Sequence, residues 1–189
     1  MMTTSERLTR CFPYVEAVVG VTQEAIRTKG DLERMYLYSA ELKTHASLLV
    51  LADAASLPSA SIAHAFHRYA DIFGNEALFN RLIALLHDHR VLFLLPDIIE
   101  HVAARIARKR AIGVYTCYSA TILDEDVRTR IDARVRSFGK YTDTVPLYRQ
   151  DSTLIAGFFV KGHDGWSADY SIRGSLAALT RHLTDEGLL

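Results

Sequence analysis

The chain has few of the features that mark secreted, membrane-spanning or metal-stapled proteins. Its 189 residues include only two cysteines, Cys11 and Cys117. Their separation gives neither a disulfide framework nor the close spacing of a metal site, so we expect reduced thiols. No apolar run approaches the roughly 20 residues that cross a bilayer. The first ten residues, MMTTSERLTR, contain Glu6 and no apolar core, so we expect neither a secretory signal nor a transit peptide in them.

An excess of one charge is also missing. Lysine plus arginine equals aspartate plus glutamate at 22 each, so nothing favours nucleic acid or an anionic membrane surface as a partner. The glycines form no Walker loop, no dinucleotide-binding pattern and no Gly-x-Ser-x-Gly elbow. We therefore expect no nucleic-acid partner, no cofactor and no catalytic activity.

The first part of the chain has helical periodicity instead. Residues 1–110 are expected to form an N-terminal all-α bundle of about six helices with short loops. Gly30 and Asp31 break the first helix, with Asp31 as the expected N-cap of the next. The first helix carries an apolar stripe of Phe12, Val15, Val18, Val19 and Ile26. The later helices are expected at Leu32–Leu42, Thr44–Ala54, Ser61–Phe73, Glu76–His87 and Val91–Arg108.

Beyond residue 110 the pattern changes, and residues 111–189 are expected to form a small α+β domain. Gly162–Gly165 supplies a hairpin turn, and Ser171 stands where the N-cap of a terminal helix belongs. The expected strands are Ile112–Tyr118, Thr142–Tyr148, Leu154–Lys161 and Trp166–Tyr170. A helix over Asp124–Phe138 presents Val127, Ile131, Val135 and Phe138 on one face, and the terminal helix presents Ile172, Leu176, Leu179 and Leu183.

One group of side chains allows a metal to be considered. His64 and His67 are three residues apart on an expected helix, with Asp71 four further on, which is a spacing that suits a metal ion. A packed or solvated helix face explains the same residues. A metal-dependent helical-bundle hydrolase is therefore one alternative function, and a general protein-interaction adaptor is another.

The last forty residues resemble the C-terminal signature of the δ subunit of F-type ATP synthases, called OSCP in mitochondria. Ala156 replaces one glycine of the family pattern, and Tyr170 replaces another. Weaker similarities lie in Phe79–Arg110, in Tyr118–Leu123 and in Tyr14–Val19. The matching residues are Asp151, Leu154, Ile155, Gly157, Lys161, Asp169, Ser171, Ile172, Arg173, Gly174 and Leu176.

The resemblance implies a non-catalytic stator subunit that links the catalytic α/β hexamer to the peripheral b stalk, so that proton flow is coupled to ATP synthesis. It implies that the bundle receives the N-terminal helix of an α subunit and that the second domain engages the b subunits. The expected place is the cytoplasmic face of a bacterial inner membrane, or alternatively the mitochondrial matrix or chloroplast stroma side.

The resemblance also implies where the partners dock. The groove for the α-subunit helix is expected between the first and fifth helices, at Tyr14, Ala17, Val18, Leu82 and Leu86. The alternative for Val18, which we treat as an exposed groove residue, is that it belongs to the core, as most residues of apolar stripes do. Structural or stalk-docking roles are expected for Asp151, Leu154, Gly157, Asp169, Ser171, Arg173 and Gly174.

Overall fold

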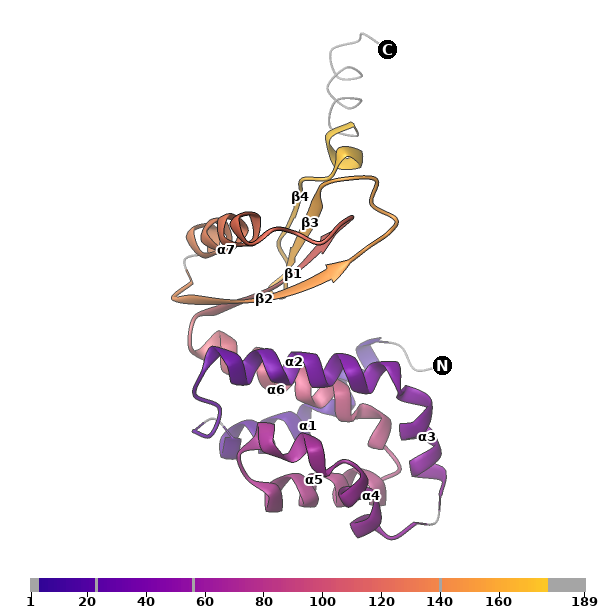
Figure 1. Ribbon diagram of the computed structural model, residues 1–189. Coiled ribbons are helices and arrows are strands. Elements are labelled where there is room, and N and C mark those ends of the chain that lie inside the picture. The colour runs from indigo at the N-terminus through magenta and orange to yellow at the C-terminus, as the bar shows by residue number, and fades with distance from the viewer. Residues whose placement is uncertain (1–3, 23, 56, 140, 177–189) are drawn as a thin grey trace. The chain divides into compact units, whose positions relative to one another are not determined.

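The computed structural model describes residues 4–22, 24–55, 57–139 and 141–176 (Figure 1). The chain divides into two compact units, Met1–Lys109 and Arg110–Leu189. The first is helical, and the second combines a four-stranded sheet with helices. The expected fold class, a helical bundle followed by a small α+β domain, is confirmed.

The N-terminal unit is built around its last helix. Helix α6 is strongly amphipathic, and its buried residues include Ile98, Val102 and Ile106. It packs against α1 and α2 (Figure 1). Because two helices cover its apolar side, α6 forms the centre of the bundle. The elements in order are α1 (Thr4–Thr22), α2 (Lys29–Thr44), α3 (Ala46–Ala54), α4 (Ser59–Ala65), the 3-10 helix η1 (His67–Phe73), α5 (Glu76–Asp88), the 3-10 helix η2 (Leu92–Leu94) and α6 (Leu95–Lys109).

Helix α2 begins earlier than expected, and the expected N-cap at Asp31 is wrong. The cap is Thr28, whose hydroxyl oxygen accepts a hydrogen bond from the Asp31 N–H at 3.1 Å. The Asp31 carboxylate in turn accepts from the Thr28 N–H at 2.8 Å. This reciprocal capping box satisfies two helix-end donors, so Gly30 lies inside the first turn of α2 rather than in a break.

The helix expected over Ser61–Phe73 is also wrong as a single element. Helix α4 ends at Ala65, and the chain continues from His67 as a 3-10 helix. At Phe66 the backbone N–H is shared between the carbonyls of Ile62 and Ala63, both at 3.2 Å, which is typical of a helix tightening at its end. Gly74, with φ of 62°, then turns the chain into α5.

The second unit is one sheet with strand order β2-β1-β3-β4. Strands β1 (Ile112–Ser119) and β2 (Asp143–Gln150) are parallel and are joined through α7 (Glu125–Gly139). Strand β3 (Phe158–Gly162) is antiparallel to β1 and forms a hairpin with β4 (Ser167–Asp169). The core of this unit lies between α7 and the sheet and consists of Tyr115, Cys117, Ile131, Val135 and Val160.

Three expectations for this unit need correction or lie outside the described residues. The first hairpin strand begins at Phe158 rather than Leu154, because Gly157 has φ of 85°, which ends extended pairing there. Phe138 is exposed and does not pack between α7 and the sheet. Its ring meets Trp166 edge to face, with centroids 5.7 Å apart. Leu179 and Leu183 lie outside the described residues.

Candidate docking surfaces

The start of the bundle is tied to the end of α5 by one polar contact. The hydroxyl oxygen of Tyr14 lies 2.7 Å from Nδ1 of His89, and the two rings meet edge to face with centroids 6.3 Å apart. His89 is the C-cap of α5. The contact therefore holds α1 beside the C-terminal end of α5, the pair of helices expected to form the groove.

The structure divides the five expected groove residues into two groups. Val18 is only 3 % exposed, and Leu82 and Leu86 are also buried. The expectation that Val18 is an exposed groove residue is therefore wrong, because it packs in the core of the bundle. Tyr14 is half-buried and Ala17 is exposed, so these two are accessible to a partner.

Two exposed apolar residues on these two helices were not identified from the sequence. Val21 is 56 % exposed on α1, and Leu85 is exposed on α5. Tyr14, Ala17 and Val21 are spaced i, i+3 and i+7, so they share one stripe of α1, and Leu85 is one turn before His89 on α5. Helical spacing alone places Tyr14, Ala17 and Val21 on one face of α1. The sequence could therefore have indicated this stripe if the apolar residues of the helix had been divided into two faces.

The suggested metal ligands do not converge. The rings of His64 and His67 are 6.5 Å apart between centroids, and His67 Nε2 lies 3.4 Å from Glu76. Asp71 is engaged instead by Arg34, at 3.6 Å. Across the part of the chain that the structure describes, no group of three or more His, Cys, Asp or Glu residues could hold a metal ion. The spacing argument required one continuous helix, and the helix ends at Ala65.

Four residues of the C-terminal motif build one closed turn. Gly157 lies under the backbone of Tyr170, where a Cβ would be 2.4 Å from the Tyr170 carbonyl oxygen. Gly174 faces the carboxylate of Asp169, which a Cβ would meet at 2.4 Å. Between them the Ser171 hydroxyl oxygen accepts from the Gly174 N–H at 3.0 Å, as an N-cap does. Close approach of backbone therefore requires glycine at Gly157, whereas at Gly174 an added Cβ would displace the Asp169 carboxylate.

Charge and hydrogen bonding reinforce this turn. The Ser171 N–H donates to Asp169 Oδ1 at 2.9 Å. Hydrogen bonds from the side chain and backbone of Ser171 lower the pKa of Asp169 below its ordinary value. The N–H of Ile172 donates to the Ala156 carbonyl at 3.1 Å. These contacts fix the start of the last helix against the segment before β3.

The other motif positions shape the approach to that turn. Asp151 accepts hydrogen bonds from the Thr153 N–H at 2.9 Å and from its hydroxyl at 2.6 Å. Hydrogen bonds from Thr153 lower the pKa of Asp151. The N–H of Leu154 donates to the Asp151 carbonyl at 3.2 Å. Arg173 is exposed and lies near enough to Asp169 to lower its pKa further.

The two departures from the family pattern are accommodated locally. Among the described non-glycine residues only Arg90 and Ala111 have positive φ, so Ala156 occupies ordinary backbone where a methyl group costs no strain. Tyr170 projects its ring onto Phe158, with centroids 5.1 Å apart and an interplanar angle of 35°. Neither substitution disturbs the turn that the motif builds.

Four exposed apolar side chains lie on the segments around this turn. Ile155 and Ile122 are 78 % and 79 % exposed, and their loops are joined by the Ala120 N–H donating to the Gly157 carbonyl at 3.3 Å. Ile172 and Leu176, on the last helix, are exposed as well. We call these four isoleucine and leucine residues the apolar end of the second unit. Exposed apolar clusters of this kind mark protein interaction sites.

The geometry thus describes a two-unit protein in which each unit has an apolar surface suited to protein docking. A model of the ATP synthase delta (OSCP) subunit family matches residues 12–183. A chain in the cryo-EM structure of the Toxoplasma gondii mitochondrial ATP synthase hexamer is similar in fold, with a TM-score of 0.61 and 14% sequence identity. The match covers 91% of this chain and 96% of that one. Comparison with curated proteins gives no significant match.

The chain belongs to the ATP synthase delta (OSCP) subunit family. It is a stator subunit of the peripheral stalk of an ATP synthase. No helix among the described residues is long and apolar enough to cross a membrane.

Proposed function

We propose that this stator subunit joins the catalytic hexamer to the stalk through one docking surface in each unit. The N-terminal unit receives the N-terminal helix of an α subunit, and the C-terminal unit engages the b subunits. The protein itself catalyses nothing. The observation that carries the proposal is the pair of apolar surfaces, one on α1 and α5 and one at the apolar end, that both units leave exposed.

The α-subunit surface is the α1 stripe of Tyr14, Ala17 and Val21 together with Leu85 on α5. An amphipathic helix binds by laying apolar residues spaced i, i+3 or i+4 and i+7 against such a surface. Val18, Leu82 and Leu86 are buried. They pack in the core below this surface and do not contact the α-subunit helix themselves. The Tyr14–His89 contact keeps the two helices in register.

The stalk surface is the apolar end of Ile122, Ile155, Ile172 and Leu176. The motif residues beside it act by shaping the turn that displays these side chains, since Gly157, Ser171 and Gly174 make contacts inside the unit. A helical b segment would bury these exposed side chains. Each Å² of apolar surface removed from water would contribute roughly 25 cal/mol of favourable free energy.

The mechanical role follows from these two attachments. Rotation of the central shaft imposes torque on the hexamer, and a link bound at both ends keeps the hexamer from turning with the shaft. We place the protein at the cytoplasmic face of a bacterial inner membrane, held there through the complex. The mitochondrial matrix or chloroplast stroma side is the alternative, and the similar Toxoplasma gondii structure is a mitochondrial complex.

Titration calorimetry with two peptides tests this proposal. A peptide from the N-terminal end of the α chain should bind the wild-type protein, and a peptide from the C-terminal end of the b chain should bind independently of it. ATP should give no heat of binding, and no hydrolysis should follow. A general adaptor would bind neither peptide, and micromolar ATP binding would contradict the non-catalytic role.

A further inference from the structure

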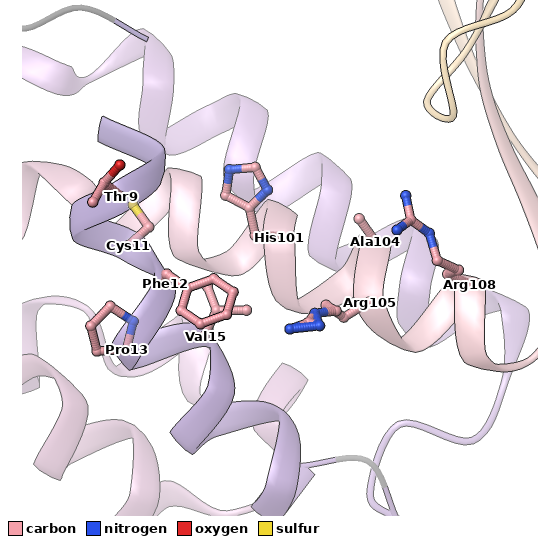
Figure 2. Close-up of a pocket in the computed structure, with 9 residues that line it drawn as sticks. All are labelled: Thr9, Cys11, Phe12, Pro13, Val15, His101, Ala104, Arg105 and Arg108. Atoms are coloured by element: carbon pink, nitrogen blue, oxygen red, sulfur yellow. The ribbon is translucent and has the colours of Figure 1, made fainter. Parts of the chain in front are cut away.

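A hollow of about 540 Å³ lies between α1 and α6 (Figure 2). Val15 and Ala104 line it, and so does the ring of Phe12, which is 59 % exposed. Phe12 and Tyr14 are two positions apart, which places them about 160° apart around the helix. The hollow therefore lies on the other flank of α1 from the surface proposed for the α subunit.

One wall of this hollow is basic. His101, Arg105 and Arg108 line it from α6 at positions i, i+4 and i+7, so they share one face of that helix. Arg105 is ion-paired with Glu16, and its guanidinium carbon lies 5.6 Å from the centre of the Phe12 ring. The side chains of His101 and Arg108 have no hydrogen-bond or ion-pair partner among the described residues. We call these six lining residues, Phe12, Val15, His101, Ala104, Arg105 and Arg108, the basic groove.

We propose that the basic groove is a second helix-docking site, whose partner is an amphipathic helix with carboxylates that face His101, Arg105 and Arg108. The apolar lining would take the small apolar side chains of that helix, because a groove between two helices admits a ridge of a third. His101 and Arg108 would gain charge-assisted hydrogen bonds. The seven-residue span from His101 to Arg108 is about 10 Å, or two turns of a helix.

Chemistry separates this site from the α1 and α5 surface. Tyr14, Ala17 and Val21 offer one hydroxyl group and otherwise apolar atoms, whereas the basic groove combines an apolar lining with His101, Arg108 and the Glu16-paired Arg105. A charge pattern of this kind selects one partner by complementary charge and rejects others of like charge. The two surfaces should therefore bind different helices at the same time.

A labelled probe peptide tests the proposal on the full chain. The probe is a 15-residue helix with one leucine and alanine stripe and glutamates at i, i+4 and i+7, and its matched control carries glutamine at those three positions. Fluorescence anisotropy should show the glutamate probe binding at least tenfold more tightly than the control, with affinity falling as salt rises. Equal binding of the two peptides would overturn the proposal.

Two variants locate the binding. Arg108→Glu should weaken the glutamate probe at least tenfold, because it puts like charge against the probe, whereas Arg81→Glu, an exposed arginine on α5, should leave its affinity unchanged. Circular dichroism checks that both remain folded. Unchanged affinity in Arg108→Glu would overturn the proposal. Displacement of the probe by the α-subunit peptide would also overturn it, since the basic groove would then be the α-subunit site.

Discussion

Asp53 Oδ1 and His87 Nδ1 face each other at 3.9 Å in the interior of the bundle. Within the described residues neither atom has a hydrogen-bond partner. The other carboxylate oxygen of Asp53 accepts from the Leu92 N–H at 2.7 Å. His87 Nε2 lies 3.2 Å from the Leu57 carbonyl, which accepts a hydrogen bond when Nε2 carries a proton. In the neutral ring with its proton on Nε2, Nδ1 presents a lone pair to the carboxylate, and two acceptors face each other.

Asp53→Asn should therefore stabilise the protein at neutral pH. The amide oxygen can keep the Leu92 hydrogen bond, and the amide nitrogen can donate to His87 Nδ1. Burial raises the pKa of Asp53, although hydrogen bonds from the Leu92 and Phe93 N–H groups oppose it. We expect a gain of about 1 kcal/mol at pH 7.5, the usual net value of one hydrogen bond, measured by urea unfolding.

The sign of the pH dependence follows from that raised pKa. A carboxyl with a raised folded pKa contributes stability that is complete below its ordinary value of 3.8 and is lost as pH rises through the folded value. Asparagine does not titrate, so its contribution to stability does not change with pH. The gain in unfolding free energy from Asp53→Asn should therefore shrink from pH 7.5 toward pH 4. Asp53→Ala is the control, and it should be destabilised because it leaves the Leu92 N–H unpaired. A pH-independent difference for Asp53→Asn would contradict the account.

The capping box of α2 predicts the opposite pH dependence. Burial alone would raise the pKa of Asp31, but hydrogen bonds from the backbone and side chain of Thr28, from Arg34 and from the Arg27 N–H lower it to about 2. The charged form is therefore the stabilising one, present above the ordinary value of 3.8 and lost as pH falls toward 2. Asp31→Asn should cost up to about 1 kcal/mol at pH 7. Urea unfolding should show that deficit closing between pH 4 and pH 2, and a constant deficit would refute this reading.

Gly157 should be less replaceable than Gly165. Both have positive φ, 85° and 103°, so alanine at either adopts strained backbone at about 1 kcal/mol or more. Only at Gly157 does a Cβ also meet backbone, 2.4 Å from the Tyr170 carbonyl, whereas nothing lies within 4 Å at Gly165. Gly157→Ala should lower the thermal midpoint clearly further than Gly165→Ala. Equal shifts would show that close packing under Tyr170 is not needed.

The α-subunit surface can be separated from the core by two neighbouring valines. Val21→Asp changes an exposed side chain and should leave the circular dichroism spectrum intact while weakening an α-subunit peptide at least tenfold, about 1.4 kcal/mol. Val18→Asp should instead destabilise the fold, because it buries an unpaired charge. Val50→Asp, an exposed valine on α3, is the matched control and should bind the peptide normally. Normal peptide binding by Val21→Asp would place the α-subunit site elsewhere.

Periodicity and turn chemistry in the sequence predicted the architecture well. The change from helical to strand pattern after Arg110 lies one residue from the junction of the two units. Ser171 does cap the last helix. Errors arose where two local signals competed. Thr28 and Asp31 can each cap a helix, and only the pairing of both side chains with both N–H groups decides for Thr28.

Exposure was harder to predict than periodicity. Val18 and Val21 are both apolar residues of one helix, and the sequence alone does not say which neighbours cover each. The structure buries Val18 and exposes Val21. Phe138 shows the same limit, because it continues the α7 stripe but lies beyond the edge of the sheet core, against Trp166. The proposed docking surfaces therefore required tertiary structure, while the Ser171 cap of the last helix could be predicted from the sequence.

Reconstitution of proton pumping tests the stator role most directly. Membrane vesicles that contain the ATP synthase but have been stripped of this protein should hydrolyse ATP yet fail to acidify, because the hexamer is no longer held against rotation. Adding the purified wild-type chain should restore acidification driven by ATP, and adding Val21→Asp at the same concentration should not. Full acidification without the protein would contradict its role as a stator, and full rescue by Val21→Asp would contradict the proposed α-subunit attachment.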